Sequence, residues 1–201
     1  MSLLPLFRRS GALLEGHFRL SSGLHAERYF QCALVLSDPR AAARLGRALA
    51  AEVRLAGWKP DLVVSPALGG VVIGHEAARA LGTRAYFTER GPDGLLALRR
   101  GFRLERGERV LVVEDVVTTG KSTSEVAALV RAHGARPVGA AAIVLRGERA
   151  PRLGMPLRAL AHLPAAGWAP ATCPLCARGL PLVKPGSRPE SPSQEKKACR
   201  R

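Results

Sequence analysis

The chain has 201 residues, of which 47% are hydrophobic and 4% aromatic, and its formal net charge is +15. This length allows one well-buried domain with an accessory piece and excludes two full domains. The sequence has no apolar run of ~18 residues, no secretory signal and only four Cys, so we expect a cytoplasmic protein without a membrane partner or a disulfide framework.

The positive charge has two interpretations. A positive field attracts polyanionic partners, which are either nucleic acids or phosphorylated metabolites. Alternatively, the excess of Arg reflects the codon bias of a GC-rich genome and has no functional meaning. The charge does not choose between these interpretations.

The N-terminal third predicts a short helix, two strands and a long helix. The short helix covers residues 2–10, and the strands cover 13–20 and 28–32 on either side of a turn. Residues 37–39, Ser-Asp-Pro, are typical of a helix start, and apolar residues then recur at helical spacing until Gly57.

From residue 61 onward, strands and helices alternate. Strands are expected at 61–65, 84–88, 109–113 and 137–145, a short apolar stretch at 95–98, and helices at 71–81 and 122–133. Strands of continuous apolar character separated by helices predict an α/β fold, a parallel sheet with helices on both faces. The Pro/Ser-rich residues 184–201 are expected to form a disordered basic tail.

The segment VLVVEDVVTTGKST, residues 110–123, carries the strongest functional signal. The strand is expected to end before Glu114 and Asp115, at the sheet edge where α/β proteins bind ligands. Backbone N–H groups from Thr118 to Ser122, at a helix N-terminus, would cradle a phosphate, and Gly120 allows close approach. The two acids would repel phosphate but suit the hydroxyls of a sugar diol. The pattern therefore predicts a ribose 5-phosphate site.

Two other interpretations of this segment remain. Gly120-Lys121-Ser122 matches the end of a nucleotide-binding P-loop, but that motif needs Gly at position 115, which is Asp. The segment can also be an ordinary strand-to-helix connection, in which two acids after a buried strand would have no purpose.

The segment resembles the donor-binding motif of the type I phosphoribosyltransferases: an apolar strand, two acids and a Thr/Gly-rich turn. The resemblance implies that family's parallel-sheet core with helices on both faces and a small N-terminal hood. It implies that phosphoribosyl pyrophosphate binds to Glu114, Asp115, Val116, Val117, Thr118, Thr119, Gly120, Lys121 and Ser122.

Residues 3–183 as a whole resemble the orotate phosphoribosyltransferase family. The segments that carry this resemblance are residues 11–32, 65–74, 98–102 and 173–182, besides the donor loop. The resemblance implies that Arg146 and Thr118 contact orotate, a flat base with a carboxylate that suits the planar fork of Arg. Alternatively, Arg146 is a solvated surface residue.

The resemblance also implies a domain plan and partners. It implies one phosphoribosyltransferase domain over residues 1–183, with a hood at about 1–35, a core at about 36–165 and a C-terminal segment at 166–183. A homodimer is expected, because in this family a loop reaches the neighbouring subunit's site. Mg²⁺ is expected to bind through the substrate, with no metal ligand from the protein. No nucleic-acid partner is expected.

The catalytic loop expected at 89–101 departs from the family pattern. Many members have several Lys and a His there, whereas this loop has only Arg90, Arg99 and Arg100. These three are the candidates for neutralising the departing pyrophosphate.

Other positions depart from the family as well. Many members have Lys in place of His25, Ser-Pro in place of 26–27, Lys in place of Gly69 and Asp in place of Leu145. These differences leave the predicted fold unchanged.

Cys173 and Cys176 form half of a zinc knuckle, but no second ligand pair follows at the usual spacing. Packing or a C-terminal turn is therefore favoured over a metal site, for which ligands would have to come from elsewhere. Cys32 is expected to be buried, and His17, His75, His133 and His162 are expected on the surface or in the core.

The sequence thus favours transfer of a phosphoribosyl group to orotate, giving orotidine 5′-phosphate and pyrophosphate for UMP synthesis. A purine phosphoribosyltransferase is an alternative, since the donor motif is shared. A nucleotide-sensing regulator that binds nucleic acid on the same fold is a second alternative, although the intact acid pair speaks against it.

Overall fold

The computed structural model describes residues 3–20, 23–163 and 167–185; the expected tail, apart from residues 184–185, lies outside them. The chain separates into two compact units. One consists of Cys32–Pro164, and the other combines Ser2–Gln31 with Ala165–Arg201. The C-terminal segment therefore groups with the N-terminal strands, which the sequence did not indicate.

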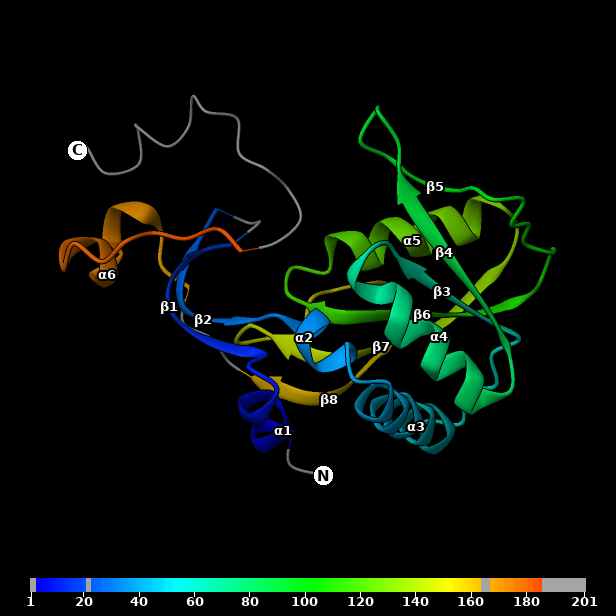
Figure 1. Ribbon diagram of the computed structural model, residues 1–201. Coiled ribbons are helices and arrows are strands. Elements are labelled where there is room, and N and C mark those ends of the chain that lie inside the picture. The colour runs from blue at the N-terminus through cyan, green and yellow to red at the C-terminus, as the bar shows by residue number, and fades with distance from the viewer. Residues whose placement is uncertain (1–2, 21–22, 164–166, 186–201) are drawn as a thin grey trace. The chain divides into compact units, whose positions relative to one another are not determined.

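The first unit contains a six-stranded sheet in the order β5-β4-β3-β6-β7-β8 (Figure 1). Its strands are β3 (Leu62–Pro66), β4 (Arg84–Arg90), β5 (Leu96–Leu98), β6 (Arg109–Val117), β7 (Arg136–Arg146) and β8 (Leu157–Leu163). Neighbouring strands are parallel except β4 and β5, which pair antiparallel. The predicted α/β fold with a parallel sheet is confirmed.

Helices cover both faces of this sheet. The unit contains α2 (Cys32–Leu36), α3 (Pro39–Leu55), α4 (Gly69–Leu81) and α5 (Lys121–Ala132). Val64 and Val112 share a core cluster with Val126 of α5, whereas a Cβ at Gly74 of α4 would meet Ser65 and Val63. Because side chains alternate along a strand, α4 and α5 lie on opposite faces.

The predicted start of the long helix is confirmed. The Asp38 carboxylate caps α3 by accepting the Arg40 N–H at 2.9 Å, and Pro39 occupies the first helical position. The helix ends at Leu55, and Gly57 then has a φ of 72°, a conformation that glycine adopts without strain.

The expected end of the strand before Glu114 is wrong. β6 continues to Val117, because Val116 and Val117 pair with Val144 and Leu145 of β7. The acid pair therefore lies within the paired part of β6, near its carboxyl end, and not beyond the strand.

Two other elements were missed or misplaced. β8 was not predicted, because its Leu, Ala and Arg residues are better helix formers than strand formers. The expected strand at 28–32 begins earlier, at His25, where it pairs with Arg19, and Cys32 already belongs to α2.

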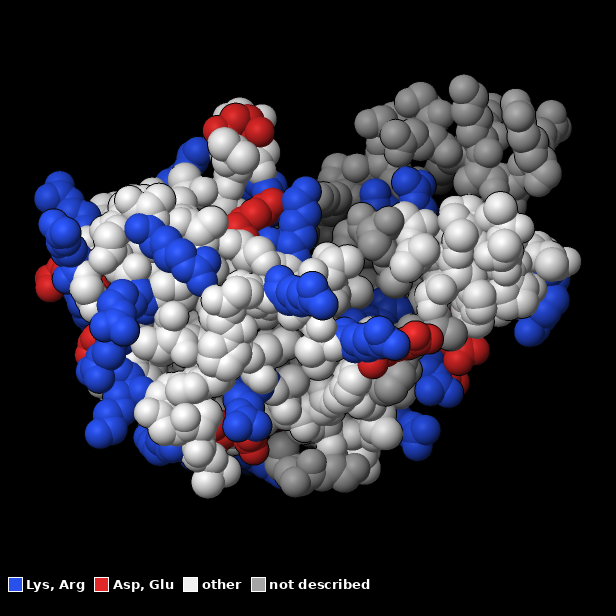
Figure 2. All heavy atoms as spheres, turned by 180° about the vertical axis from the view of Figure 1, so that it is seen from behind, with Lys and Arg blue, Asp and Glu red and all other residues white. Residues whose placement is uncertain are grey.

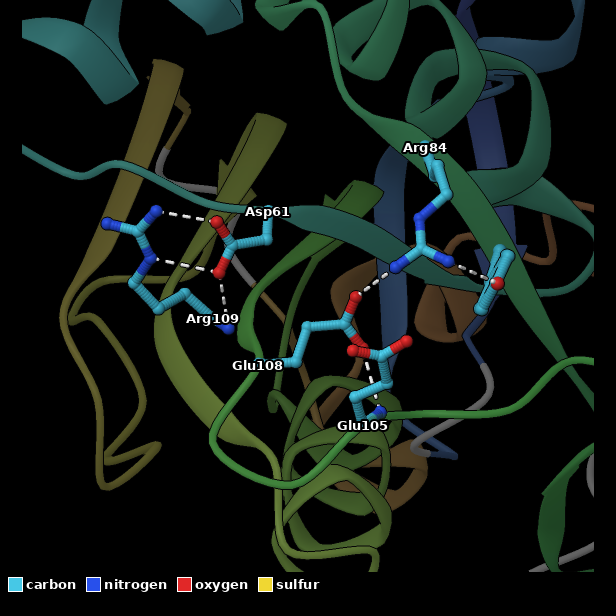
Figure 3. Close-up of polar contacts among 6 residues, drawn as sticks. Asp61, Arg84, Glu105, Glu108 and Arg109 are labelled. Carbon is cyan, nitrogen blue, oxygen red and sulfur yellow. Dashed lines mark hydrogen bonds and ion pairs between the residues drawn. The ribbon is translucent and has the colours of Figure 1, made fainter.

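Ion pairs tie the amino-terminal ends of three neighbouring strands (Figure 3). Arg109, the first residue of β6, donates from Nε (2.9 Å) and Nη2 (2.5 Å) to Asp61, which precedes β3. These hydrogen bonds lower the pKa of Asp61 to about 2. Arg84, the first residue of β4, pairs with the buried Glu108 that precedes β6. The strand ends opposite the predicted ligand edge are thus held in register.

The second unit is built on a β-hairpin. Its elements are α1 (Leu4–Arg9), β1 (Leu13–Arg19), β2 (His25–Phe30), the 3-10 turn Pro170–Thr172 and α6 (Pro174–Ala177). The C-terminal segment is joined to this hairpin twice, where Trp168 bridges His25 and where Val183 bridges Phe18.

Charged residues are spread over the surface. On the face in Figure 2, Lys and Arg side chains are scattered among neutral residues, with Asp and Glu between them. Among the described residues, no helix is long and apolar enough to cross a membrane.

Candidate active site

The acid pair lies at the carboxyl end of β6, one acid on each face of the strand. Asp115 is on the α4 side, where a Cβ at Gly69 would come within 2.7 Å of both carboxylate oxygens. Glu114 shares the opposite face with Val112, by the alternation of side chains. The carboxylates therefore flank the end of β6 from both sides.

Burial makes both carboxylates reluctant to ionise. Glu114 is 9% exposed, and its pKa is raised well above the usual value, mainly by burial and then by the charge of Asp115. Burial also raises the pKa of Asp115, partly offset by backbone N–H groups, of which Val116 N–H donates to Oδ1 at 2.8 Å. Two buried acids near each other favour a bound group that offers hydrogen-bond donors.

The turn after β6 leads into α5 as predicted. Gly120 has a φ of 74°, and a Cβ there would come within 2.4 Å of Leu153 Cδ2. The Ser124 N–H donates to the Gly120 carbonyl at 2.8 Å. The N–H groups of Lys121 and Ser122 precede this bond and belong to the first turn, whose donors have no partner inside the helix. An anion placed there also meets the positive end of the helix dipole.

The connection between β3 and α4 joins the same sheet edge, and sequence reasoning gave it no role. α4 begins at Gly69, where an added Cβ would come within 2.7 Å of the Asp115 carboxylate. The signal was the Gly-Gly pair at 69–70, which closely follows the buried strand β3. Lack of a side chain at Gly69 leaves the space that the Asp115 carboxylate occupies.

Arg146 ends β7, next to the donor turn. Val117 pairs with Leu145, so the following residues, Thr118 and Arg146, emerge from neighbouring strands. Arg146 is only 5% exposed, which excludes the alternative of a solvated surface residue. The structure thus brings together the two residues that were predicted to contact orotate.

The arginines expected in the catalytic loop differ in their surroundings. Arg90 ends β4 and pairs with Glu125 at 2.7 Å, and Arg100 donates to both oxygens of Glu89 at 2.9 and 2.8 Å. Within the described part of the chain, Arg99 forms no ion pair and is exposed. β5 pairs with β4, so the expected open loop is partly a hairpin.

Several known proteins are similar to this chain in sequence and in fold. The family model of the phosphoribosyl transferase domain matches residues 35–160. The orotate phosphoribosyltransferase of Pelotomaculum thermopropionicum is 50% identical over 186 residues, covering 92% of this chain and 96% of that protein. Its counterpart in Heliobacterium modesticaldum is also 50% identical, with coverages of 92% and 97%. The crystal structure of the Aeropyrum pernix orotate phosphoribosyltransferase is similar with a TM-score of 0.67, at 28% identity, covering 81% of this chain and 94% of that one.

A mostly parallel sheet, with two acids near the carboxyl end of a central strand and a turn that leads into a helix, is consistent with the phosphoribosyltransferase class. Within that class, the chain belongs to the orotate phosphoribosyltransferase family, because the identity of its relatives extends over nearly their whole length.

We expect Glu114→Gln to stabilise the protein at alkaline pH. A raised folded-state pKa favours the folded protein below the unfolded-state pKa, and this advantage is lost as pH rises through the folded pKa. The variant should therefore gain in free energy of unfolding relative to the wild type as the pH rises above about 4, the ordinary pKa of an unfolded Glu. Denaturant titrations at several pH values measure this. The exposed Glu105→Gln is the control and should show no such trend; a Glu114→Gln variant that is less stable at alkaline pH contradicts the prediction.

We expect Gly120→Ala to damage both stability and donor binding. A left-handed conformation costs an L-residue about 1–2 kcal/mol, and the new Cβ would also clash with Leu153. The control Gly82→Ala has nearly the same φ, 76°, with no atom within 4 Å of the added Cβ. Both variants should lose unfolding free energy, but only Gly120→Ala should raise the KM for the donor. Equal KM values in the two variants would show that the turn does not approach the donor.

Proposed function

We propose that the chain transfers the phosphoribosyl group of phosphoribosyl pyrophosphate to orotate, and that the carboxyl edge around β6 holds both substrates. The observation that carries the proposal is the placement of a buried acid, a partly buried acid and a helix N-terminus at the carboxyl end of one strand. The names of the relatives, orotate phosphoribosyltransferases, support orotate as the acceptor.

The phosphate, ribose and pyrophosphate of the donor each have a matching group at the carboxyl edge of the sheet. The first turn of α5, with the hydroxyls of Thr118, Thr119 and Ser122, would bind the 5-phosphate. Glu114 and Asp115 would accept hydrogen bonds from the ribose hydroxyls from the two sides of β6. The first turn of α4 would bind the pyrophosphate, since its N–H groups lie at the same edge.

Mg²⁺ fits this site as a partner of the donor. Phosphate oxygens are among its preferred ligands, so it would bind through the pyrophosphate of the donor, with no ligand from the protein. The buried Glu114 and the partly buried Asp115 would stay with the ribose hydroxyls at the same edge. When bound, Mg²⁺ would neutralise charge on the leaving pyrophosphate. The protein itself would hold the sugar and would supply positively charged side chains that stabilise the leaving pyrophosphate.

The reaction requires charge stabilisation more than acid–base catalysis. Breaking the bond between C1 and pyrophosphate builds positive charge on the sugar and negative charge on the leaving group, as in other glycosyl transfers. Arg146 would hold the orotate carboxylate and so direct the ring nitrogen toward C1. An anionic acceptor needs little help from a base.

We further propose that the chain works as a homodimer in the cytoplasm, on small charged metabolites. Arg99, which directly follows β5, is exposed, and in such a dimer it would serve the neighbouring subunit's site. The regulator alternative is less well supported, because the acids are intact and the basic residues in Figure 2 are dispersed.

Arg146→Ala tests the choice of acceptor. We expect the KM for orotate to rise at least thirtyfold, because loss of one partner of a buried charge pair costs about 2–5 kcal/mol. The KM for the donor should stay near the wild-type value, and Arg146→Lys should be intermediate because it keeps the charge but loses the fork. A spectrophotometric assay with orotate, adenine and guanine measures this. Use of a purine but not of orotate would refute the proposed acceptor.

Arg99→Ala and Arg100→Ala test the role of the loop. We expect Arg99→Ala to lower kcat by about a hundredfold, the usual loss when one group that stabilises developing charge is removed. Arg100 is already paired with Glu89, so its substitution should have the smaller effect. Steady-state kinetics on both variants decides, and a larger loss in Arg100→Ala would reverse the assignment.

A further inference from the structure

Four side chains with metal-binding atoms gather in the second unit, and none of them is a residue assigned to the substrates. They are His17 of β1, His25 of β2, Cys173, which directly precedes α6, and Cys176 within α6. Their ligand atoms all lie within 4.8 Å of one another. His17, His25 and Cys173 are buried, and Cys176 is partly buried.

The spacing of these atoms matches a tetrahedral zinc site. Bond lengths for zinc in proteins imply separations of about 3.3 Å between two nitrogens and about 3.6 Å between nitrogen and sulfur. His17 Nε2 and His25 Nδ1 are 3.0 Å apart. Cys173 Sγ and Cys176 Sγ lie 3.5 and 3.7 Å from His17 Nε2, and Cys176 Sγ lies 3.3 Å from His25 Nδ1. These four separations are within about 0.3 Å of those that a zinc ion would impose.

The second nitrogen of His17 has the partner that a metal-bound imidazole usually has. Nδ1 lies 2.9 Å from the carbonyl oxygen of Leu180, to which it can only donate. Donation from Nδ1 leaves the lone pair of Nε2 directed toward the other three ligands. A backbone carbonyl in this position fixes the ring and raises the basicity of the ligating nitrogen.

The backbone holds the two halves of the cluster together. Trp168 and His25 exchange two hydrogen bonds of 2.8 and 2.9 Å, and Val183 N–H donates to the His17 carbonyl at 2.8 Å. The segment between Trp168 and Val183 carries both cysteines, so it is tied to the hairpin on either side of them. His17 and Cys173, 156 residues apart in sequence, are therefore neighbours in a fixed framework.

We propose that His17, His25, Cys173 and Cys176 bind one zinc ion, which joins the N-terminal hairpin to the C-terminal segment. Two nitrogens and two sulfurs complete a tetrahedron and leave no position open for a substrate, so the site is structural. Binding requires both cysteines as thiolates, so zinc uptake releases the two thiol protons to the solvent.

The size of the second unit explains why it would need such a site. A unit of this size buries too little apolar surface to be stable without a disulfide, a metal or another constraint. Its described hydrophobic core is small and includes Phe7, Phe18, Ala26 and Phe30. A zinc ion that links segments so far apart in sequence also restricts the unfolded chain, as a disulfide with the same loop would.

Cobalt binding to the wild-type chain is the deciding experiment. The full chain, without a histidine tag, is stripped of metal under reducing conditions and titrated with Co²⁺. We expect intense visible d–d bands and near-ultraviolet thiolate-to-cobalt charge transfer, saturating at one ion per chain, and then loss of both when Zn²⁺ is added. Co²⁺ bound only by oxygen ligands near the donor site would give weak bands without charge transfer, so the two sites are distinguishable. Absence of the charge-transfer bands overturns the proposal.

Matched substitutions assign the ligands. Cys173→Ser, Cys176→Ser, His17→Gln and His25→Gln should each lose the tetrahedral cobalt spectrum and the zinc measured in the purified protein. Cys199→Ser and His75→Gln remove the same side chains elsewhere and should retain one zinc per chain. Because a variant that fails to fold also loses metal, thiol reactivity of the wild type is measured with and without Zn²⁺. Protection of two thiols by Zn²⁺ supports the site, whereas equal reactivity means a cluster held by packing alone and refutes it.

Discussion

The parallel pairing of β6 with β7 is the interaction on which the candidate active site depends. The ladder runs from Arg109 to Val117, so it carries the acid pair to the sheet edge and delivers Thr118 and Arg146 from neighbouring strands. The donor turn and the predicted orotate contacts are therefore parts of one rigid arrangement. The ion pairs at the amino ends of β3, β4 and β6 support this register from the opposite edge.

Much of the first unit was readable from the sequence, because its signals are local. Continuous apolar strands, the Asp38-Pro39 cap and the glycine stops gave the α/β order, and the resemblance to known phosphoribosyltransferases gave the family. The end of β6 was misjudged because charged residues usually mark the end of a buried strand, whereas here the pairing with Val144 and Leu145 continues past them. β8 was missed because its residues favour helix locally, and only pairing with β7 makes them a strand.

The cluster in the second unit could not be predicted for a different reason. The cysteine pair alone is an incomplete motif, and its histidine partners precede it by about three quarters of the chain. Nothing local links His17 with Cys173; the link arises only because the C-terminal segment pairs with the hairpin. His25 stood out in the sequence only because many family members have Lys there. A role as zinc ligand would explain why His stands at this position.

The raised pKa values of the acid pair connect the stability of the protein with its proposed activity. Two carboxylates that burial holds back from ionising lower the stability of the free protein at neutral pH. A bound diol with its hydroxyl donors, or a divalent cation, would reduce the free-energy cost of burying these carboxylates. That reduction would contribute to the affinity for the donor. The surrounding hydrophobic ladder must therefore be stable enough to tolerate the pair, and the four residues that precede it in β6, Val110 to Val113, are fully buried.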